Sequence, residues 1–199
     1  MELENLVQAV TDSLFVELEA SGRHVHVTEA QAMTLFGHPL TPARPLSQPG
    51  QFLARERVTL VGEKGEFRDV AVLGPERREG QVEISLTDGR VLGIAPPVRL
   101  SGDVEGTPGI VLLGPNGRVE LTQGVIAAKR HIHLTPRAAA HFGVKNGENV
   151  KLKALTRRPV IFEDVSVRVS EQFAPFAHLD YDEANACGFC KGDLGRILK

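Results

Sequence analysis

The feature that most constrains this chain is a tetrapeptide that occurs twice. RHVH stands at residues 23–26 and RHIH at residues 130–133, so four of the seven histidines lie in the two copies. The similarity extends downstream through TLFG and AHFG, and it returns in FRDVAV at 67–72 and FEDVSV at 162–167. Self-similarity of this kind indicates an internal duplication. We therefore predict two similar modules, of which the first carries an insertion.

The local patterns are those of an all-β protein. Short apolar stretches are separated by 20 glycines and 12 prolines, which is typical of many short strands. Hairpin turns between strands are predicted at residues 87–90 and 114–117. Short helices are predicted over Glu29–Phe36 and Pro136–Phe142, because each follows a threonine suited to an N-cap and precedes a glycine. An amphipathic helix is predicted over residues 1–10.

Composition narrows the range of partners. The net charge is −2 and the basic residues are scattered, which argues against binding to nucleic acid or to an anionic membrane. No apolar run reaches the ~18 residues of a membrane span, and the N-terminus does not look like a signal peptide, so we expect a cytoplasmic protein.

Cys187 and Cys190 form a single CxxC, which we interpret as two reduced cysteines. A proline-rich loop at about 37–57 is typical of a lid.

The repeated histidines are placed where a strand would aim them at one metal ion. Side chains alternate between the two faces of a strand, so both histidines of a copy project to the same side. The two pairs are His24 with His26 and His131 with His133. Two ligands are too few for zinc, which takes three or four. A third ligand is therefore expected in each module.

The repeat itself supplies that third ligand. Glu83 stands sixteen residues after Phe67, and His178 stands sixteen residues after Phe162. Each module then offers three ligands and an open coordination position, as catalytic zinc sites do. The predicted sets are His24, His26 and Glu83, and His131, His133 and His178. Iron, manganese and nickel suit the same ligands, and a purely structural role for the histidines stays open. Asp180 can orient an imidazole or start a helix.

Arginines flank these ligands. Arg77 lies in a turn that leads into the strand of Glu83, where a guanidinium can clamp a phosphate or polarise a carbonyl. A solvated arginine beside Arg78 is the alternative. Arg23 and Arg130 directly precede the histidine pairs and point to the opposite strand face. We interpret these two as structural residues or as partners of the ligands.

These residues permit a family to be named. The chain resembles the PduL-type phosphotransacylases, also called phosphate propanoyltransferases, in SGRHVHVT, QPGQF, LGPERREGQVEISLTDG, SGD, AAKRHIHLTP and HLDYDEANACG. The resemblance implies two β-barrels from the duplication, capped by short α-helices, with a two-metal site between them that usually holds zinc. Residues 23–128 would form the first barrel with its lid loop. Residues 129–199 would form the second, completed by a strand at about 11–22.

The resemblance also implies an activity. An acyl-CoA such as propanoyl-CoA or acetyl-CoA would react reversibly with phosphate, giving acyl phosphate and CoA. By motif, the family's metal ligands fall on the six residues above, its essential arginine on Arg77, and its lid on residues 48–50. We expect phosphate to attack the thioester directly. Ser21 and Asn185 flank the ligands and are candidates for contacts with CoA.

Assembly is less constrained by the sequence. We expect a homo-oligomer, with a dimer favoured, and the family implies a role in propanediol degradation inside a bacterial microcompartment. Many members carry an encapsulation peptide at the front, whereas only about a dozen residues precede the body here. Work in the cytoplasm and work inside a microcompartment, beside its shell or core enzymes, both stay open.

Two competing interpretations remain. A double cupin-like oxygenase or isomerase would also have two barrels with histidine pairs, and Glu29 follows the first pair closely. RHIHLTP has no such acid, and Arg77 would then have no purpose. A metal-stabilised scaffold without activity would explain the ligands but not the open coordination positions.

Overall fold

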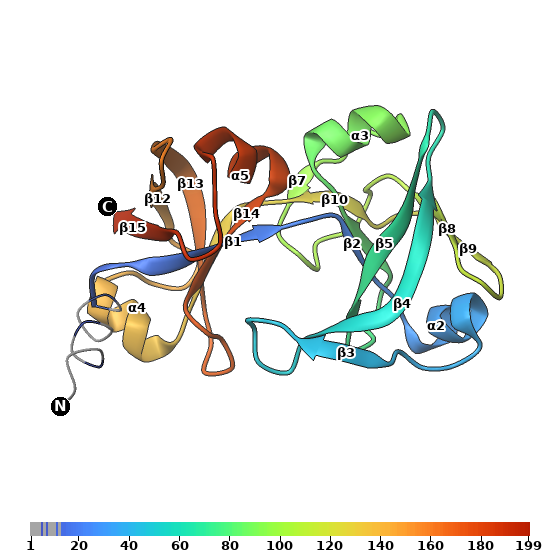
Figure 1. The fold of residues 1–199 in the computed structure, drawn as a ribbon, viewed down its shortest axis with the longest axis horizontal. Coiled ribbons are helices and arrows are strands. Elements are labelled where there is room, and N and C mark those ends of the chain that lie inside the picture. Colours follow the sequence, from blue (N-terminus) through green and yellow to red (C-terminus); the bar gives the residue numbers. More distant parts are fainter. Residues whose placement is uncertain (1–4, 6, 8–10, 12) are drawn as a thin grey trace. The chain divides into compact units, whose positions relative to one another are not determined.

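The computed structural model describes residues 5, 7, 11 and 13–199. Beyond residue 14 the chain is mostly strand, with four short helices (Figure 1), so the predicted all-β fold class is confirmed. Contacts divide the chain into two units. Unit 1 contains the residues up to Ser21 together with Arg130–Lys199, and unit 2 is Gly22–Lys129. Within the described part of the chain, no helix has the length and apolar character that crossing a membrane requires.

Unit 1 is a closed barrel of six strands in the order β1-β14-β11-β13-β12-β15. Its strands are β1 (Val16–Ser21), β11 (His131–Leu134), β12 (Asn149–Leu155), β13 (Val160–Val169), β14 (Phe176–Asp180) and β15 (Leu194–Leu198). β1 closes the barrel because it pairs in parallel with β14 and antiparallel with β15. In Figure 1 it is the blue strand among the orange and red ones. Val16 and Leu18 alternate inward from β1 and belong to the core of this unit.

Unit 2 is a nine-stranded sheet that curls around its own apolar core (Figure 1). Its order is β7-β10-β6-β2-β5-β4-β8-β9, with β3 paired to β4 beside this path. The strands are β2 (His24–His26), β3 (Pro42–Pro45), β4 (Phe52–Val61), β5 (Glu66–Gly74), β6 (Gln81–Glu83), β7 (Val98–Arg99), β8 (Ile110–Leu113), β9 (Arg118–Leu121) and β10 (Val125–Ala128).

The two units share one arrangement around their histidine strands. β2 lies between antiparallel β6 and parallel β5, and β11 lies between antiparallel β14 and parallel β13. Both parallel neighbours contain a bulge in which an aspartate has a left-handed backbone, Asp69 at φ 56° and Asp164 at φ 54°. Aspartate is one of the few residues that adopt this conformation readily. The shared bulge supports the internal duplication.

The strands that precede the histidine strands are exchanged. β1 leads into β2 of unit 2 but pairs with β14 of unit 1. β10 leads into β11 of unit 1 but pairs with β6 of unit 2. In unit 1, β14 with His178 therefore pairs in parallel with β1, the strand that precedes the histidines of unit 2. In unit 2, β6 with Glu83 pairs in parallel with β10, the strand that precedes the histidines of unit 1.

The helices end where their capping residues place them. α2 (Glu29–Phe36) and α4 (Pro136–Phe142) are confirmed as predicted. The Thr28 side chain accepts from the backbone of Gln31, and the Gln31 side chain accepts from the backbone of Thr28, which satisfies two N–H groups at the helix start. Both helices end at a glycine with a left-handed backbone. The helix predicted over residues 1–10 falls largely outside the described residues.

One predicted hairpin is wrong. Residues 87–90 lie in α3 (Leu86–Leu92), which Ser85 and Asp88 cap reciprocally. Thr-Asp-Gly-Arg was interpreted as a turn, but the glycine serves close packing, since a Cβ on Gly89 would lie 2.6 Å from the carbonyl oxygen of Ile94. The hairpin predicted at 114–117 is confirmed between β8 and β9.

About half of the long loop predicted at about 37–57 is strand. β3 and β4 pair antiparallel within it, and residues 46–51 form the turn between them. Prolines at both ends of β3 suggested a loop, but a strand at the side of a sheet tolerates proline because it need not donate every backbone hydrogen bond.

Leu18 tests how strongly β1 belongs to unit 1. A Cβ on Gly195 would lie 2.7 Å from the Leu18 side chain, so the leucine packs tightly against β15. We expect Leu18→Ala to lower the free energy of unfolding by about 2–5 kcal/mol, the usual effect of truncating a buried leucine. Glu17→Ala, on the other face of the same strand, is the control and should change it by less than about 0.5 kcal/mol. Equal effects of the two changes in urea denaturation would contradict this packing.

Candidate metal centres

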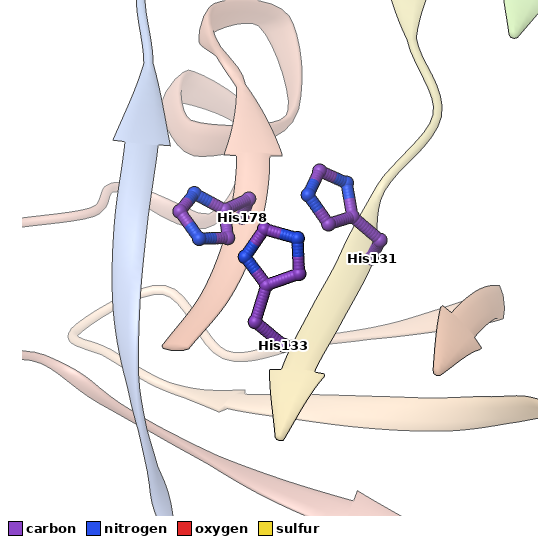
Figure 2. Close-up of side chains that lie close together, drawn as sticks. All are labelled: His131, His133 and His178. Atoms are coloured by element: carbon purple, nitrogen blue, oxygen red, sulfur yellow. The ribbon is translucent and has the colours of Figure 1, made fainter. Parts of the chain in front are cut away.

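Unit 1 brings His131, His133 and His178 together, and we call them the histidine triplet. β11 presents His131 and His133 on one face, and His178 comes from β14, where it lies directly opposite His131 in the antiparallel pair. Figure 2 shows the three rings gathered on one side of these two strands. Their centroids are 4.7–5.0 Å apart, and their possible ligand atoms all lie within 4.8 Å of one another.

His133 carries the clearest sign that this cluster fits a metal ion. The ring is buried, and neither of its nitrogens has a hydrogen-bond partner among the described residues. It stacks on Phe173 at 4.1 Å between centroids. Burial, and then the charges of His131 and Arg168, lower the pKa of His133 to about 3. The ring is therefore neutral near pH 7 and can offer a lone pair, which is the form that binds a cation.

Unit 2 brings His24, His26 and Glu83 together, and we call them the carboxylate triplet. All three are buried, with 6%, 2% and 7% of their surface exposed. His24 lies directly opposite Glu83 in the antiparallel pair of β2 and β6, and its Nε2 is 3.6 Å from Glu83 Oε2. The ligand atoms lie within 4.8 Å of one another. The alternate residues on the other face, such as Val25 and Val82, are fully buried in the apolar core.

The rings of three ligands are oriented through their Nδ1 atoms. His24 Nδ1 contacts the carbonyl oxygen of Gly22 at 2.8 Å, and His26 Nδ1 contacts that of Leu73 at 3.2 Å. A carbonyl oxygen only accepts, so the neutral ring donates from Nδ1 and keeps its lone pair on Nε2. In unit 1, His178 Nδ1 lies 3.4 Å from Glu19 Oε2 on β1. Such partners fix the tautomer and the orientation of metal-binding histidines.

Electrostatics in the carboxylate triplet favour an ionised Glu83. Burial opposes its charge most strongly, but the charge of His24 and its hydrogen bond outweigh this and hold the pKa of Glu83 well below its usual range. Burial likewise opposes a charge on His24, yet the nearby Glu83 raises the pKa of His24. Burial, followed by the charges of His24 and Arg77, lowers the pKa of His26 far below its usual value. The cluster thus combines an anionic ligand with a neutral imidazole.

Arg77 lies beside the carboxylate triplet. Its positive charge opposes protonation of both His24 and His26, as expected of a guanidinium at close range, although Glu83 outweighs it at His24 and the pKa of His24 is raised. The Arg77 backbone N–H donates to the carbonyl oxygen of Val27 at 2.8 Å, and its Nη1 donates to Ser101 Oγ at 3.1 Å. Arg77 as a whole residue is partly exposed.

Gln81 and Ser101 link Arg77 to the ligand Glu83, and the sequence analysis did not single them out. Gln81 Nε2 donates to Glu83 Oε1 at 2.6 Å and to Ser101 Oγ at 2.9 Å. The backbone N–H of Gly102 donates to Gln81 Oε1 at 2.7 Å. Gln81 was detectable as the residue two before Glu83, on the same strand face, and Ser101 opens the SGD motif.

The remaining predicted residues belong to unit 1. Ser21 ends β1, and its register partner Asp180 follows His178 by two residues. Asn185 lies exposed on α5 (Tyr181–Cys187). Their contact with CoA stays a prediction. Asp180 caps α5 by accepting from the backbone of Glu183 at 2.8 Å, so of its two suggested roles the structure shows the helix start.

Comparison with known proteins identifies the family. The model of the phosphate propanoyltransferase family matches residues 17–190. A phosphate propanoyltransferase of Enterococcus faecalis is 54% identical over 92% of this chain and 88% of its own length. Those of Clostridioides difficile and Thermotoga maritima are 49% and 53% identical, over 99% and 90% of this chain and 95% and 87% of their own lengths.

The chain belongs to the phosphate propanoyltransferase family. The resemblance found in the sequence is thereby confirmed, and the chain is a transferase that moves an acyl group to or from phosphate. The family match does not favour the double cupin-like alternative.

His133 gives a direct test of metal binding in this family member. His133→Phe keeps a flat ring but removes two buried nitrogens, each of which costs about 1–3 kcal/mol when it is left without a partner. We expect the metal-free variant to be at least as stable as the metal-free parent in thermal unfolding. The parent should gain about 2.7 kcal/mol from each triplet that binds zinc, at a zinc concentration a hundred times the dissociation constant of that site, and the variant should lose the contribution of the histidine triplet.

The matched control is His141→Ala, since His141 is the exposed histidine of unit 1 and lies outside the triplet. It should gain as much from zinc as the parent does. A His133→Phe protein that zinc stabilises fully would show that the triplet does not bind the ion.

Proposed function

We propose that this chain transfers a short acyl group between CoA and phosphate with the help of two divalent metal ions, one on each triplet. Propanoyl-CoA and acetyl-CoA are the proposed substrates, and acyl phosphate and CoA the products. The proposal rests on one observation: a chain of the phosphate propanoyltransferase family contains two three-ligand clusters in which every residue but the partly buried His178 is buried.

Zinc is the proposed ion at both sites. Three histidines, or two histidines and a carboxylate, with a position left for substrate, are ligand sets of catalytic zinc sites. When bound, such ions act as Lewis acids and templates for a phosphate or carbonyl oxygen. The nitrogens of His133, which have no hydrogen-bond partner among the described residues, and the anionic Glu83 support a bound cation, because both are costly in a buried site without one.

The residues of the chain supply position and charge. A phosphate oxygen attacks the thioester carbonyl carbon and forms a C–O bond, and the C–S bond then breaks. CoA leaves as a thiolate, which takes up from solvent the proton that the attacking hydrogenphosphate gives up. Arg77 stabilises the negative charge that develops on the carbonyl oxygen. Its hydrogen bond to Ser101 limits the orientations of the guanidinium. Holding the two reactants in line removes much of the entropic barrier.

Direct transfer is favoured over an acyl-enzyme. Cys187 is fully buried in the apolar core of unit 1, and burial raises the pKa of its thiol, which makes it a poor nucleophile. Cys190 is exposed and accepts a hydrogen bond from Arg157 at the end of α5. The proposed reaction needs neither thiol.

The basic experiment is a thiol-release assay with acetyl-, propanoyl- and butanoyl-CoA, with and without phosphate. We expect CoA to be released only when phosphate is present, with formation of one acyl phosphate per thiol. Release without phosphate would point to a hydrolase, and no release from any of the three thioesters would contradict the proposal.

Arg77→Ala tests the role of the guanidinium. Removing an oxyanion-stabilising donor should lower kcat by about 10²–10³, while both metal ions stay bound. The matched control is Arg78→Ala, because Arg78 is the exposed neighbour in the same turn, and it should keep near-parental turnover. Near-parental turnover of Arg77→Ala with full metal content would rule out this role.

Single ligand changes test whether one reaction needs both ions. His26→Ala and His131→Ala should each remove one ion per chain, and each should lower turnover on the order of 10³ or more, because a metal ion contributes several kcal/mol of charge stabilisation. Metal content and thiol release are measured on the same samples. If one variant loses its ion and keeps its turnover, the corresponding triplet is structural.

Assembly and location complete the proposal. On the family resemblance we propose a homodimer that works in the cytoplasm or inside a microcompartment for propanediol degradation, with Ser21 and Asn185 contacting CoA. The scaffold alternative predicts metal binding without any phosphate-dependent release of thiol, so the assay above also separates it.

A further inference from the structure

The arginine that opens each repeat pairs with a carboxylate in its own unit. Arg23 contacts Asp88 with two nitrogens, Nη2 to Oδ1 at 2.6 Å and Nε to Oδ2 at 3.1 Å. Arg130 contacts Glu183, Nη1 to Oε1 at 2.7 Å. The two pairs span 65 and 53 residues of sequence. The same contact has therefore formed twice, independently of the different lengths of the two modules.

The two carboxylates occupy the same place. Each stands five residues after the third ligand of its triplet, in the first turn of the helix that follows the ligand strand. Asp88 also accepts from the backbone of Ser85 at 3.3 Å, and Glu183 accepts from the backbone of Asp180 at 3.1 Å. Each carboxylate is thus held by its own helix cap and by the arginine at once.

Both pairs are more restrained than a surface ion pair. The side chain of Asp88 is 7% exposed, and the Arg23 guanidinium lies 4.1 Å from the centroid of the Phe67 ring. The side chain of Glu183 is 17% exposed, and Arg130 Nε donates to the carbonyl oxygen of Glu163 at 2.7 Å. Partial burial and paired contacts give such charge-assisted hydrogen bonds a defined geometry.

Each ion pair adjoins the ligands of its own triplet along the chain. Arg23 directly precedes His24, which is the strand partner of Glu83, and Arg130 directly precedes His131, the strand partner of His178. Each ion pair therefore joins the start of a histidine strand to the helix that follows the third ligand. It restrains the separation and angle of the first and third ligands.

We propose that Arg23–Asp88 and Arg130–Glu183 are two positioning pairs, each of which sets the metal affinity of the triplet in its own unit. This inference rests on the proposed metal binding but not on the acyl transfer. Partners outside the ligand set commonly change metal affinity 10–100-fold, and we expect an effect of that size from loss of either pair.

The test is a Co²⁺ titration of the full chain with one triplet disabled, followed by its visible absorption. In the His24→Ala, His26→Ala background only the histidine triplet binds. Glu183→Gln should weaken that binding about 10–100-fold and shift the absorption bands, while Asp88→Asn, the matched control in the other unit, should change neither. In the His131→Ala, His133→Ala background, the roles of the two variants should exchange.

These variants separate positioning from stability. Glutamine at the place of Glu183 can still complete the capping box, so the helix start is kept while the ion pair is lost. Arg130→Gln should reproduce the effect of Glu183→Gln, and Arg130→Lys, which keeps the charge, should restore part of the affinity. Thermal unfolding by circular dichroism shows whether each variant is folded.

Crossed effects, in which each variant weakens only the triplet of its own unit, support the inference. Unchanged affinity in both backgrounds overturns it, as does an equal loss at both triplets. If neither double-alanine background binds Co²⁺, the metal sites of the proposed function fail as well. If both backgrounds bind Co²⁺ but the variants change nothing, only the positioning role is overturned.

Discussion

The burial of five polar side chains in two clusters, with a sixth, His178, partly buried, is the constraint on which the rest of this structure depends. An imidazole or carboxylate loses its water on burial, and the protein must provide a partner or bear a cost of several kcal/mol. Glu83 and His24 partly solve this by pairing, but His133 is buried with both nitrogens unpaired among the described residues. A cation held by each cluster would satisfy one nitrogen of each histidine and the carboxylate of Glu83. The apolar strand faces opposite the clusters are then free to build the two cores.

The duplication explains both the likeness of the two sites and their difference. Strand pairing places the first and third ligands of each unit opposite one another, so the geometry was inherited with the fold. The side chains then diverged: unit 2 has Glu83 and Gln81 where unit 1 has His178 and Phe176. A carboxylate ligand lowers the net charge at its ion, whereas three neutral imidazoles leave the full charge of the ion exposed to substrate. Since Arg77 lies beside the carboxylate triplet, its guanidinium partly restores the positive charge lost there.

The sequence predicted what depends on local pattern and on the repeat. Alternation along a strand identified the histidine pairs, and equal offsets from Phe67 and Phe162 led to Glu83 and His178, which the structure brings to those pairs. A local pattern gave a wrong prediction where the same residue types suit two structures. Residues 87–90 are typical of a hairpin turn, but they lie in a capped helix.

Apart from the two ligand sets, contacts between distant segments were not predicted. Gln81 meets Ser101 across 20 residues, and Arg23 meets Asp88 across 65. Both depend on the register of strands and on where α3 begins. A single sequence carries no local pattern that encodes such a register, so the network around Arg77 and the ion pairs emerged only from the fold.

The most direct test of the account is stoichiometric reactivation. Protein stripped by a chelator is given increasing equivalents of Zn²⁺, and phosphate-dependent release of CoA is measured at each step. The account predicts an inactive stripped protein whose activity is fully restored, with the break at two ions per chain. Full activity in protein shown by elemental analysis to hold no transition metal would contradict it, and so would a break at one ion per chain.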